Sequence, residues 1–138
     1  MRSTFKTRSV NGDPQVTESP FKGKTGVKRV LNALGYSLDG LSAGWVNEAA
    51  FRQVTLLALV GIPLSFVLSM PAWAHAIVVG SHLASMIVEL LNSAIEAAVD
   101  HTSLAKHDLA KRAKDLGSAA QLVCLVNLAA MWALALTA

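Results

Sequence analysis

Two long stretches of the chain carry no acidic or basic side chain. The first runs from Gln53 to Val88, and the second runs from Leu116 to Ala138. A helix crosses the hydrocarbon core of a bilayer in about 20 residues, so the first stretch holds most of two spans and the second holds one. Pro71 is a natural break inside the first stretch. The pattern therefore predicts membrane spans over about 49–69, 72–100 and 114–137.

The segment before the first span has a different pattern. Between about residues 27 and 47, apolar side chains recur at helical spacing and polar ones occupy the rest of the helical wheel. The apolar face consists of Val27, Val30, Leu31, Leu34, Leu38, Leu41 and Trp45. This pattern is typical of an amphipathic helix that lies in the membrane interface with its tryptophan at headgroup level. Residues 1–25 are polar and contain two prolines, so we expect a disordered cytoplasmic tail there.

The composition agrees with a membrane protein. The chain has 138 residues, of which 53% are hydrophobic and only 15% are charged, and its mean hydropathy is +0.46. Such a chain is too apolar for a soluble domain of this size. We therefore expect an all-α membrane protein with one interfacial helix and three transmembrane helices.

The net charge of +3 is explained by membrane topology. Seven of the twelve Lys and Arg residues lie within the first 29 positions, and four lie between the second and third predicted spans. Positive residues near the ends of spans stay in the cytoplasm. Three spans place both basic groups on the same side, so we expect a multi-pass protein with a cytoplasmic N-terminus. The basic excess then indicates attraction to lipid headgroups, and we expect no binding of nucleic acid.

Polar side chains form a stripe on the second predicted span. Steps of three, four and four residues bring Glu89, Asn92, Glu96 and Asp100 to nearly the same face of a helix. Burying a carboxylate in hydrocarbon is costly, so an acidic residue within a span marks a candidate functional site. Three acids and an amide on one face indicate such a site.

Depth along the helix separates the members of this stripe. Glu89 lies seven residues deeper than Glu96, roughly 10 Å at 1.5 Å per residue. Glu96 and Glu48 lie near water, and two carboxylates suit Mg²⁺, which prefers oxygen ligands. Lys114 and Asp115 lie on the same side of the membrane. Because a lysine neutralises phosphate charge and a deep carboxylate takes a proton from a hydroxyl, the pattern indicates phosphoryl transfer from a soluble nucleotide to a membrane-embedded alcohol.

Simpler interpretations of these residues stay open. Asp100 is as readily an ion-pair partner at a helix end as a direct participant in chemistry. Glu48 and Arg52 are four residues apart, which is the spacing of a structural ion pair on a helix. His82 is more typical of packing than of a ligand set. From another class of function, a small oligomeric proton- or ion-coupled transporter would also place an acid such as Glu89 inside a span.

Three sequence motifs closely resemble the bacterial integral-membrane diacylglycerol kinases. They are NEAAFRQ at 47–53, VELLNSAIEAAVD at 88–100 and RAKDLGSAA at 112–120, and RVLNALGYSLDGL precedes them. The resemblance covers about 27–138, and three motifs in this order make it specific. It implies a homotrimer in the bacterial inner membrane, with sites at the cytoplasmic face that adjacent subunits share. The implied reaction moves the γ-phosphate of MgATP to sn-1,2-diacylglycerol and gives phosphatidate.

The resemblance also implies a role for each matching residue. Glu89 would be the general base, and Asn92, Lys114 and Asp115 would complete the catalytic set. Glu48 and Glu96 would hold Mg²⁺ and contact the ATP phosphates. Further ATP contacts would come from Arg29, Tyr36, His107, Lys114 and Asp115. Lipid contacts would come from Arg29, Ser37, Trp45, Phe51, Arg52, Glu89 and Ser118.

The lipid substrate within this family stays open at the level of sequence. Some relatives phosphorylate undecaprenol, so an undecaprenol kinase is the alternative. The GSAA sequence at 117–120 is more similar to the diacylglycerol branch. Leu38 and Asp39 stand where the family often has Trp and Lys, which leaves the lipid contacts at these two positions open.

Overall fold

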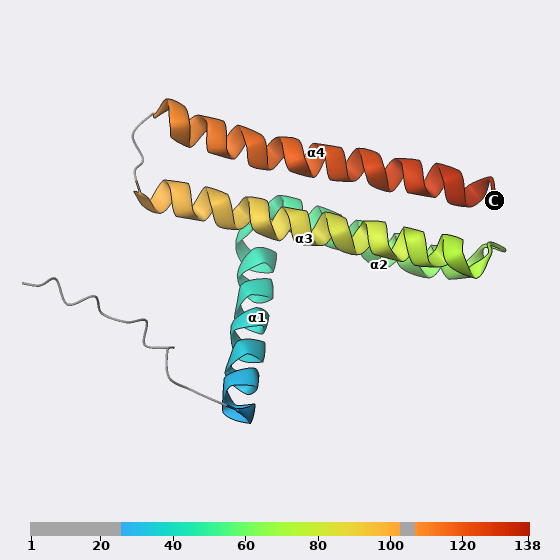
Figure 1. Cartoon of the computed structure of the whole chain (residues 1–138), viewed down its shortest axis with the longest axis horizontal. Coiled ribbons are helices and arrows are strands. Elements are labelled where there is room, and N and C mark those ends of the chain that lie inside the picture. The colour runs from blue at the N-terminus through green and yellow to red at the C-terminus, as the bar shows by residue number, and fades with distance from the viewer. Residues whose placement is uncertain (1–25, 103–106) are drawn as a thin grey trace, which may run out of the picture. The chain divides into compact units, whose positions relative to one another are not determined.

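The computed structural model describes residues 26–102 and 107–138. In this part of the chain it contains four α-helices: α1 (Val27–Asn47), α2 (Ala49–Val67), α3 (Ala72–Thr102) and α4 (Asp108–Leu136) (Figure 1). The same residues contain no β-strand, so the predicted all-α class is confirmed. The tail predicted at 1–25 lies outside the described residues.

Three of these helices are long and apolar enough to cross a membrane. They are α2, α3 and α4, whereas α1 does not meet this criterion. The three predicted spans are therefore confirmed. In the part of α1 that follows Gly35, the large apolar residues Leu38, Leu41 and Trp45 are exposed in the protomer. An uncovered apolar face of this kind agrees with a helix lying in the interface.

The start of α4 differs from the prediction. The helix begins at Asp108, six residues before the predicted start of the third span at about 114, so it also includes residues 108–113. Two features stabilise this extra length. Asp108 lies in the first turn, where a negative charge interacts favourably with the helix dipole. Lys111 and Asp115 form an ion pair four residues apart.

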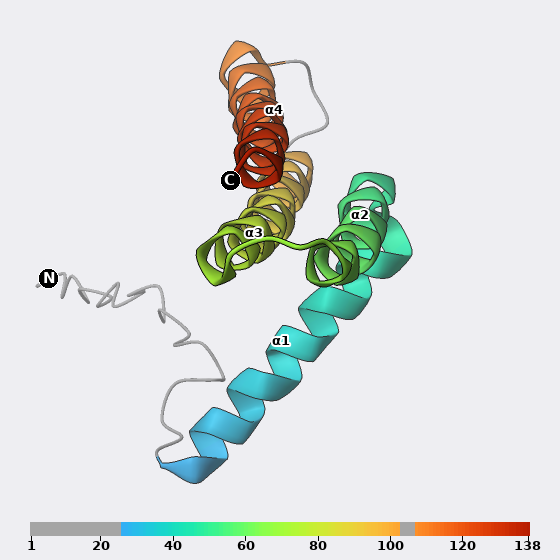
Figure 2. The ribbon, with the colours of Figure 1, turned by 90° about the vertical axis from the view of Figure 1, so that its right-hand side faces the viewer.

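The chain divides into two compact units, Met1–Gly35 and Tyr36–Ala138. The second unit contains the later part of α1 and all three spans. Within it, α3 packs against α2 on one side and against α4 on the other (Figures 1 and 2). This central position of α3 matters because α3 carries the polar stripe.

A close contact in the middle of the spans joins all three helices. His82 of α3 is 1% exposed, and its Nε2 accepts a hydrogen bond from Trp132 Nε1 of α4 at 3.1 Å. Gly61 of α2 lies against the same ring, where an added Cβ would overlap Nε2 and Cε1 of the imidazole. Small residues and hydrogen bonds between helices hold membrane bundles together because lipid tails are as apolar as leucine.

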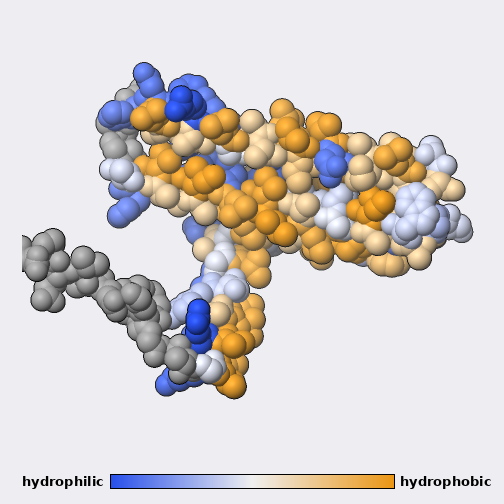
Figure 3. Space-filling model, viewed as in Figure 1, coloured by the Kyte–Doolittle hydropathy of each residue, from blue (hydrophilic) through white to orange (hydrophobic). Residues whose placement is uncertain are grey.

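The outer surface of the bundle is mostly apolar. Figure 3 shows hydrophobic side chains over most of the visible surface of the spans, and hydrophilic ones gathered where α3 ends and α4 begins. Two buried serines inside the bundle form hydrogen bonds to the backbone of their own helix. Ser65 Oγ donates to Ile62 O at 2.7 Å, and Ser81 Oγ donates to Val78 O at 2.8 Å. Such internal bonding is required where no water is available.

The two ends of the bundle interior differ in character. At one end, Ala74, Val78 and Ala135 form a buried apolar cluster, with Met70 and Trp132 packed against it. Toward the other end of α3, the buried positions are polar, starting with Ser81 and His82 and continuing through Ser85 to Glu89. The polar interior is therefore closed by apolar packing at the end of α3 that is remote from Asp100.

Gly61→Ala and Gly80→Ala form a matched pair that tests the central contact. Both substitutions gain the same helix propensity, but only the Cβ at position 61 would meet the His82 ring, whereas the Cβ at position 80 meets nothing within 4 Å. We expect Gly61→Ala to be less stable than Gly80→Ala by about 1–3 kcal/mol, because overpacking displaces His82 from Trp132. Thermal unfolding in detergent micelles measures the difference. Equal stability of the two variants would show that the contact is not tight.

Candidate active site

The site is centred on Glu89, a carboxylate buried inside the membrane-spanning bundle. Glu89 is 3% exposed, and it forms no hydrogen bond or ion pair with any of the described residues. An unpaired buried carboxylate is costly, and in a membrane span it marks a functional site. The burial of Glu89 therefore agrees with its selection from the sequence as a candidate functional residue.

A pocket of about 290 Å³, which we call the acidic pocket, is lined in part by Glu89. Its walls consist of Glu48, Ala50, Glu89, Asn92, Ser93, Glu96, Ser118 and Gln121. Three of these side chains are carboxylic acids, and none is Lys or Arg. Carboxylates that share a pocket without a basic partner repel one another, so the arrangement favours binding of a cation. The structure thus brings together the three acids that the sequence proposed for base and metal.

Glu48 reaches this pocket from the junction between α1 and α2. Its backbone is extended (φ −108°, ψ 110°), and it occupies the N-cap position of α2 without a side-chain capping bond. Ser, Thr, Asp and Asn at this position commonly accept a bond from the backbone of their own helix. Because the Glu48 carboxylate is not used in that way, it remains available to a ligand in the pocket.

Arg52 has a structural role at the same junction. Its Nη1 donates to the backbone carbonyls of Trp45 at 2.9 Å and Val46 at 3.1 Å. These carbonyls belong to the last turn of α1, which has no intrahelical partners for them. The structure contains no Glu48–Arg52 ion pair, because the helix breaks at Glu48 and the guanidinium caps α1 instead.

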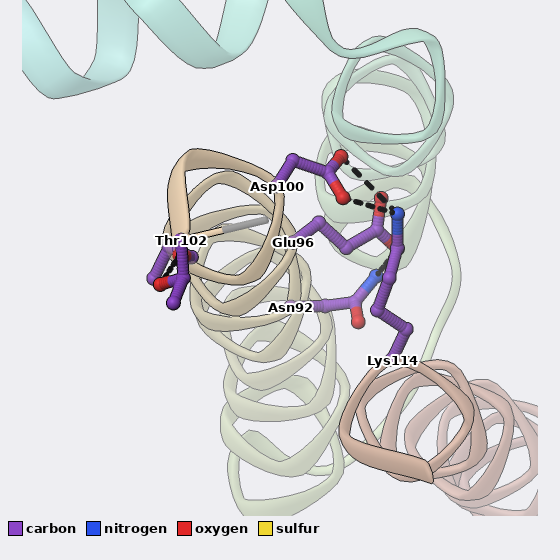
Figure 4. Close-up of polar contacts among 6 residues, drawn as sticks. Asn92, Glu96, Asp100, Thr102 and Lys114 are labelled. Atoms are coloured by element: carbon purple, nitrogen blue, oxygen red, sulfur yellow. Dashed lines mark hydrogen bonds and ion pairs between the residues drawn. The ribbon is translucent and has the colours of Figure 1, made fainter. Parts of the chain in front are cut away.

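Asn92 positions Glu96 and contacts α4. Its Nδ2 donates to Glu96 Oε1 at 3.2 Å, while its Oδ1 is buried and has no partner among the described residues. The amide lies against Gly117, where an added Cβ would overlap Oδ1. Figure 4 shows Asn92 and Glu96 projecting from α3 on the side from which Lys114 reaches across from α4.

Two ion pairs lie just outside the pocket. Lys114 Nζ bonds both carboxylate oxygens of Asp100, at 3.1 and 3.2 Å, and joins the end of α3 to the start of α4 (Figure 4). Lys111 pairs with Asp115 along α4. None of these four residues lines the acidic pocket. The ion-pair interpretation of Asp100 therefore matches the structure.

An apolar groove of about 640 Å³ adjoins the acidic pocket. It lies between the later part of α1 and α3, and its walls consist of Ser37, Gly40, Leu41, Ala43, Gly44, Asn47, Glu48, Leu90, Ser93, Ala94 and Ala97. Glu48 and Ser93 belong to both the groove and the pocket. The hydrophobic groove thus borders on the acidic pocket at Glu48 and Ser93.

Comparison with known proteins agrees with this geometry. The family model for prokaryotic diacylglycerol kinase matches residues 35–136. A protein named diacylglycerol kinase from Pseudomonas aeruginosa is 53% identical over 118 residues, which cover 86% of this chain and 96% of the relative. Proteins of the same name from Escherichia coli K12 and Helicobacter pylori 26695 are 43% and 45% identical, over 81% and 83% of this chain and 92% and 89% of the relatives.

The chain belongs to the prokaryotic diacylglycerol kinase family. It is a multi-pass bacterial membrane protein and an ATP-dependent kinase, as the sequence predicted. The alternative of a transporter is not favoured. A transport pathway would need polar groups across the whole bundle, but Ala74, Val78 and Ala135 close the end remote from the acidic pocket.

The other residues proposed for this kinase lie in several different places. Ser37 lines the groove, whereas Phe51 is 2% exposed and packs close to Gly44, lining neither cavity. Trp45 and Tyr36 are exposed on α1. His107 occupies the N-cap position of α4 and is exposed. Arg29 belongs to the first compact unit, Met1–Gly35.

Sequence analysis missed three residues that line the acidic pocket, Ala50 and the polar residues Ser93 and Gln121. Gln121 has a signal in the sequence, because it is a polar residue inside an uncharged span, four positions after Gly117 and therefore on the same face of α4. Ser93 has no such signal, since a serine in a membrane helix commonly bonds its own backbone.

A double-mutant cycle tests whether the Asn92–Gly117 contact positions the site. We expect Gly117→Ala to lower kcat/KM by about 100-fold, because the new methyl displaces the Asn92 amide and with it Glu96. Asn92→Ala removes the clashing atom, so the double variant should be no less active than Asn92→Ala alone. If the loss of activity in the double variant equals the product of the two single losses, Gly117 acts independently of Asn92 and the prediction is wrong.

Proposed function

We propose that this chain transfers the γ-phosphate of ATP to the hydroxyl of sn-1,2-diacylglycerol and gives phosphatidate. One observation carries the proposal: the unpaired buried carboxylate of Glu89 lines a pocket that opens beside an apolar groove. The groove suits acyl chains, and the pocket suits the polar end of the lipid together with a charged co-substrate. The names of the similar proteins supply the lipid.

Glu89 is proposed as the general base. The lipid hydroxyl donates its proton to the Glu89 carboxylate while its oxygen attacks the γ-phosphorus and ADP leaves. The transfer is direct and forms no covalent intermediate with the enzyme. A base must lie within hydrogen-bonding reach of the hydroxyl, which explains why this carboxylate lies deep in the span and not at its water-exposed end. Asn92 assists by holding Glu96 beside it.

Glu48 and Glu96 are proposed to hold Mg²⁺. The two carboxylates line one pocket; Glu48 is free of capping bonds, and Glu96 accepts one hydrogen bond at Oε1 only. Among the described residues no three His, Cys, Asp or Glu side chains form a cluster that could hold a metal alone. Mg²⁺ typically takes one or two carboxylates and completes its shell with water and substrate phosphates, so these residues fit it. When bound, the ion neutralises phosphate charge.

The nucleotide is proposed to bind where α3 ends and α4 begins. Lys114 would exchange its partner Asp100 for a phosphate oxygen, and Asp115 would contact the nucleotide from the same turn. Exposed ion pairs contribute little free energy, so this exchange costs little. Arg29, Tyr36 and His107 are proposed as further ATP contacts.

The lipid is proposed to enter along α1. Ser37 lines the groove and Ser118 lines the pocket, so each borders one part of a bound diacylglycerol. Trp45 would lie at headgroup level beside them. Phe51 and Arg52, together with Arg29, complete the proposed entrance; the first two fix the α1–α2 junction that shapes it.

The assembly and orientation also belong to this proposal. We expect a homotrimer in the bacterial inner membrane, with the N-terminus and the acidic pocket on the cytoplasmic side. The basic residues of the N-terminal segment and of the segment between the second and third spans support this orientation. The many exposed leucine, valine and isoleucine residues of the spans agree with burial in lipid or against neighbouring subunits.

A lipid phosphorylation assay tests the proposed reaction. Purified protein in lipid vesicles with Mg²⁺ and γ-labelled ATP should label diacylglycerol in preference to undecaprenol when each is offered alone. Preferential labelling of undecaprenol would support the alternative substrate, and absence of label in both lipids would refute the kinase function. Omission of Mg²⁺ should abolish labelling of diacylglycerol.

Two isosteric substitutions separate the proposed roles of the acids. We expect Glu89→Gln to keep MgATP affinity but to lower kcat by about 100- to 10,000-fold, because it removes the general base. Glu96→Gln removes a metal ligand and should weaken MgATP binding. Isothermal titration with a non-hydrolysable ATP analogue measures binding, and the phosphorylation assay measures turnover. Near-normal turnover of Glu89→Gln would contradict its assignment as the base.

A further inference from the structure

Gln121 of α4 is a buried amide in the wall of the acidic pocket, and no role has been assigned to it. It is 8% exposed, although it lies in a span whose other buried residues are mostly small or apolar. Its Nε2 donates to Ser85 Oγ of α3 at 3.1 Å, while its Oε1 is buried and has no partner among the described residues. Ser85 itself is 1% exposed. The amide is therefore fixed in orientation but only partly satisfied.

The unused bonding capacity of this amide is chemically specific. A glutamine amide offers two N–H donors and two acceptor lone pairs, and the bond to Ser85 uses one donor. One N–H donor and the carbonyl oxygen remain. Leaving such groups unpaired inside a membrane is unfavourable, so a polar ligand in the pocket is the natural partner.

The depth of Gln121 identifies which part of a lipid it would meet. Its partner Ser85 lies four residues from Glu89 on α3, about 6 Å further toward the middle of the bilayer. A diacylglycerol whose hydroxyl meets Glu89 carries its ester carbonyls a few bonds below that hydroxyl, where the acyl chains begin. An ester carbonyl accepts hydrogen bonds and cannot donate them, which matches the free N–H of Gln121.

We propose that Gln121 donates a hydrogen bond to an ester carbonyl of diacylglycerol and so helps this enzyme select a glycerol ester over a simple long-chain alcohol. Ser85 acts as a positioning residue that holds the amide. The inference rests on the proposed function, because it takes Glu89 as the group that meets the hydroxyl. A polyprenol has a hydroxyl but no ester carbonyl, so it cannot use this donor.

The test compares two lipids that differ only in the ester carbonyls. The ester 1,2-dioctanoyl-sn-glycerol and the ether 1,2-dioctyl-sn-glycerol share the reacting hydroxyl and the chain length. For Gln121→Leu we expect the KM of the ester to rise by about three- to tenfold with little change in kcat, because a contact remote from the reacting atoms contributes uniform binding. The KM of the ether should stay unchanged. We expect the wild-type protein to have a lower KM for the ester than for the ether, and this difference should largely disappear in Gln121→Leu.

Two further variants make the result specific. Ser85→Ala keeps the amide but frees its orientation, so the KM of the ester alone should rise, by less than in Gln121→Leu. Asn127→Leu removes an amide from an exposed position on the same helix and should leave the ester-to-ether ratio unchanged. Thermal unfolding in detergent controls for a loss of folded protein.

The possible outcomes separate this inference from the proposed function. If Gln121→Leu changes both lipids equally, the Ser85–Gln121 bond is only a contact between helices and the inference is overturned. If Ser85→Ala changes both lipids equally, the positioning role of Ser85 is wrong. If the wild-type protein phosphorylates neither lipid, the proposed kinase function fails, and the assignment of Gln121 fails with it.

Discussion

The cost of placing charge in hydrocarbon governs this structure. α3 carries three carboxylates and one amide along one face, and that face can exist in a membrane only if other protein surfaces cover it. α2 and α4 provide the cover, and they approach closely because glycines face the polar side chains: Gly61 against His82 and Gly117 against Asn92. Helix packing and the geometry of the polar site therefore depend on the same two close contacts. We expect a methyl group at either glycine to disturb both.

The polar interior is open at one end and closed at the other. Glu48, Glu89 and Glu96 line a pocket near the end of α3, whereas Ala74 and Val78 fill the opposite end with apolar packing. This asymmetry suits an enzyme that brings a water-soluble nucleotide to a lipid at one membrane face. It does not suit a pathway across the bilayer. Whether an acidic residue inside a span indicates an enzyme or a transport pathway therefore depends on whether the rest of the helix interior is polar or apolar.

The sequence predicted the spans and the acidic stripe because both depend on local periodicity and on the absence of charge, which are properties of single helices. It did not predict which partners the polar groups choose. Arg52 caps α1 and leaves Glu48 unpaired, because the chain breaks between the two helices. Lys114 pairs with Asp100 across two helices, and Gln121 lines the pocket, because α3 and α4 pack in one particular register. Such contacts depend on how the helices pack together, and residue spacing along a single helix does not predict that packing.

The position of Glu89 reflects a balance between two opposing demands. In the proposed mechanism Glu89 is the general base for a lipid hydroxyl, which requires a position below the membrane surface, yet each turn deeper raises the cost of its charge. One turn further in, α3 carries neutral Ser85, and nearly two turns further in it carries His82, which is buried and bonds Trp132 of α4. One turn toward the surface, it carries Asn92 and then the water-accessible Glu96. Glu89 is thus the deepest carboxylate of α3, and the neutral amide of Gln121 lines the same pocket. In our proposal this amide recognises the lipid at a depth where a second charge would be too costly.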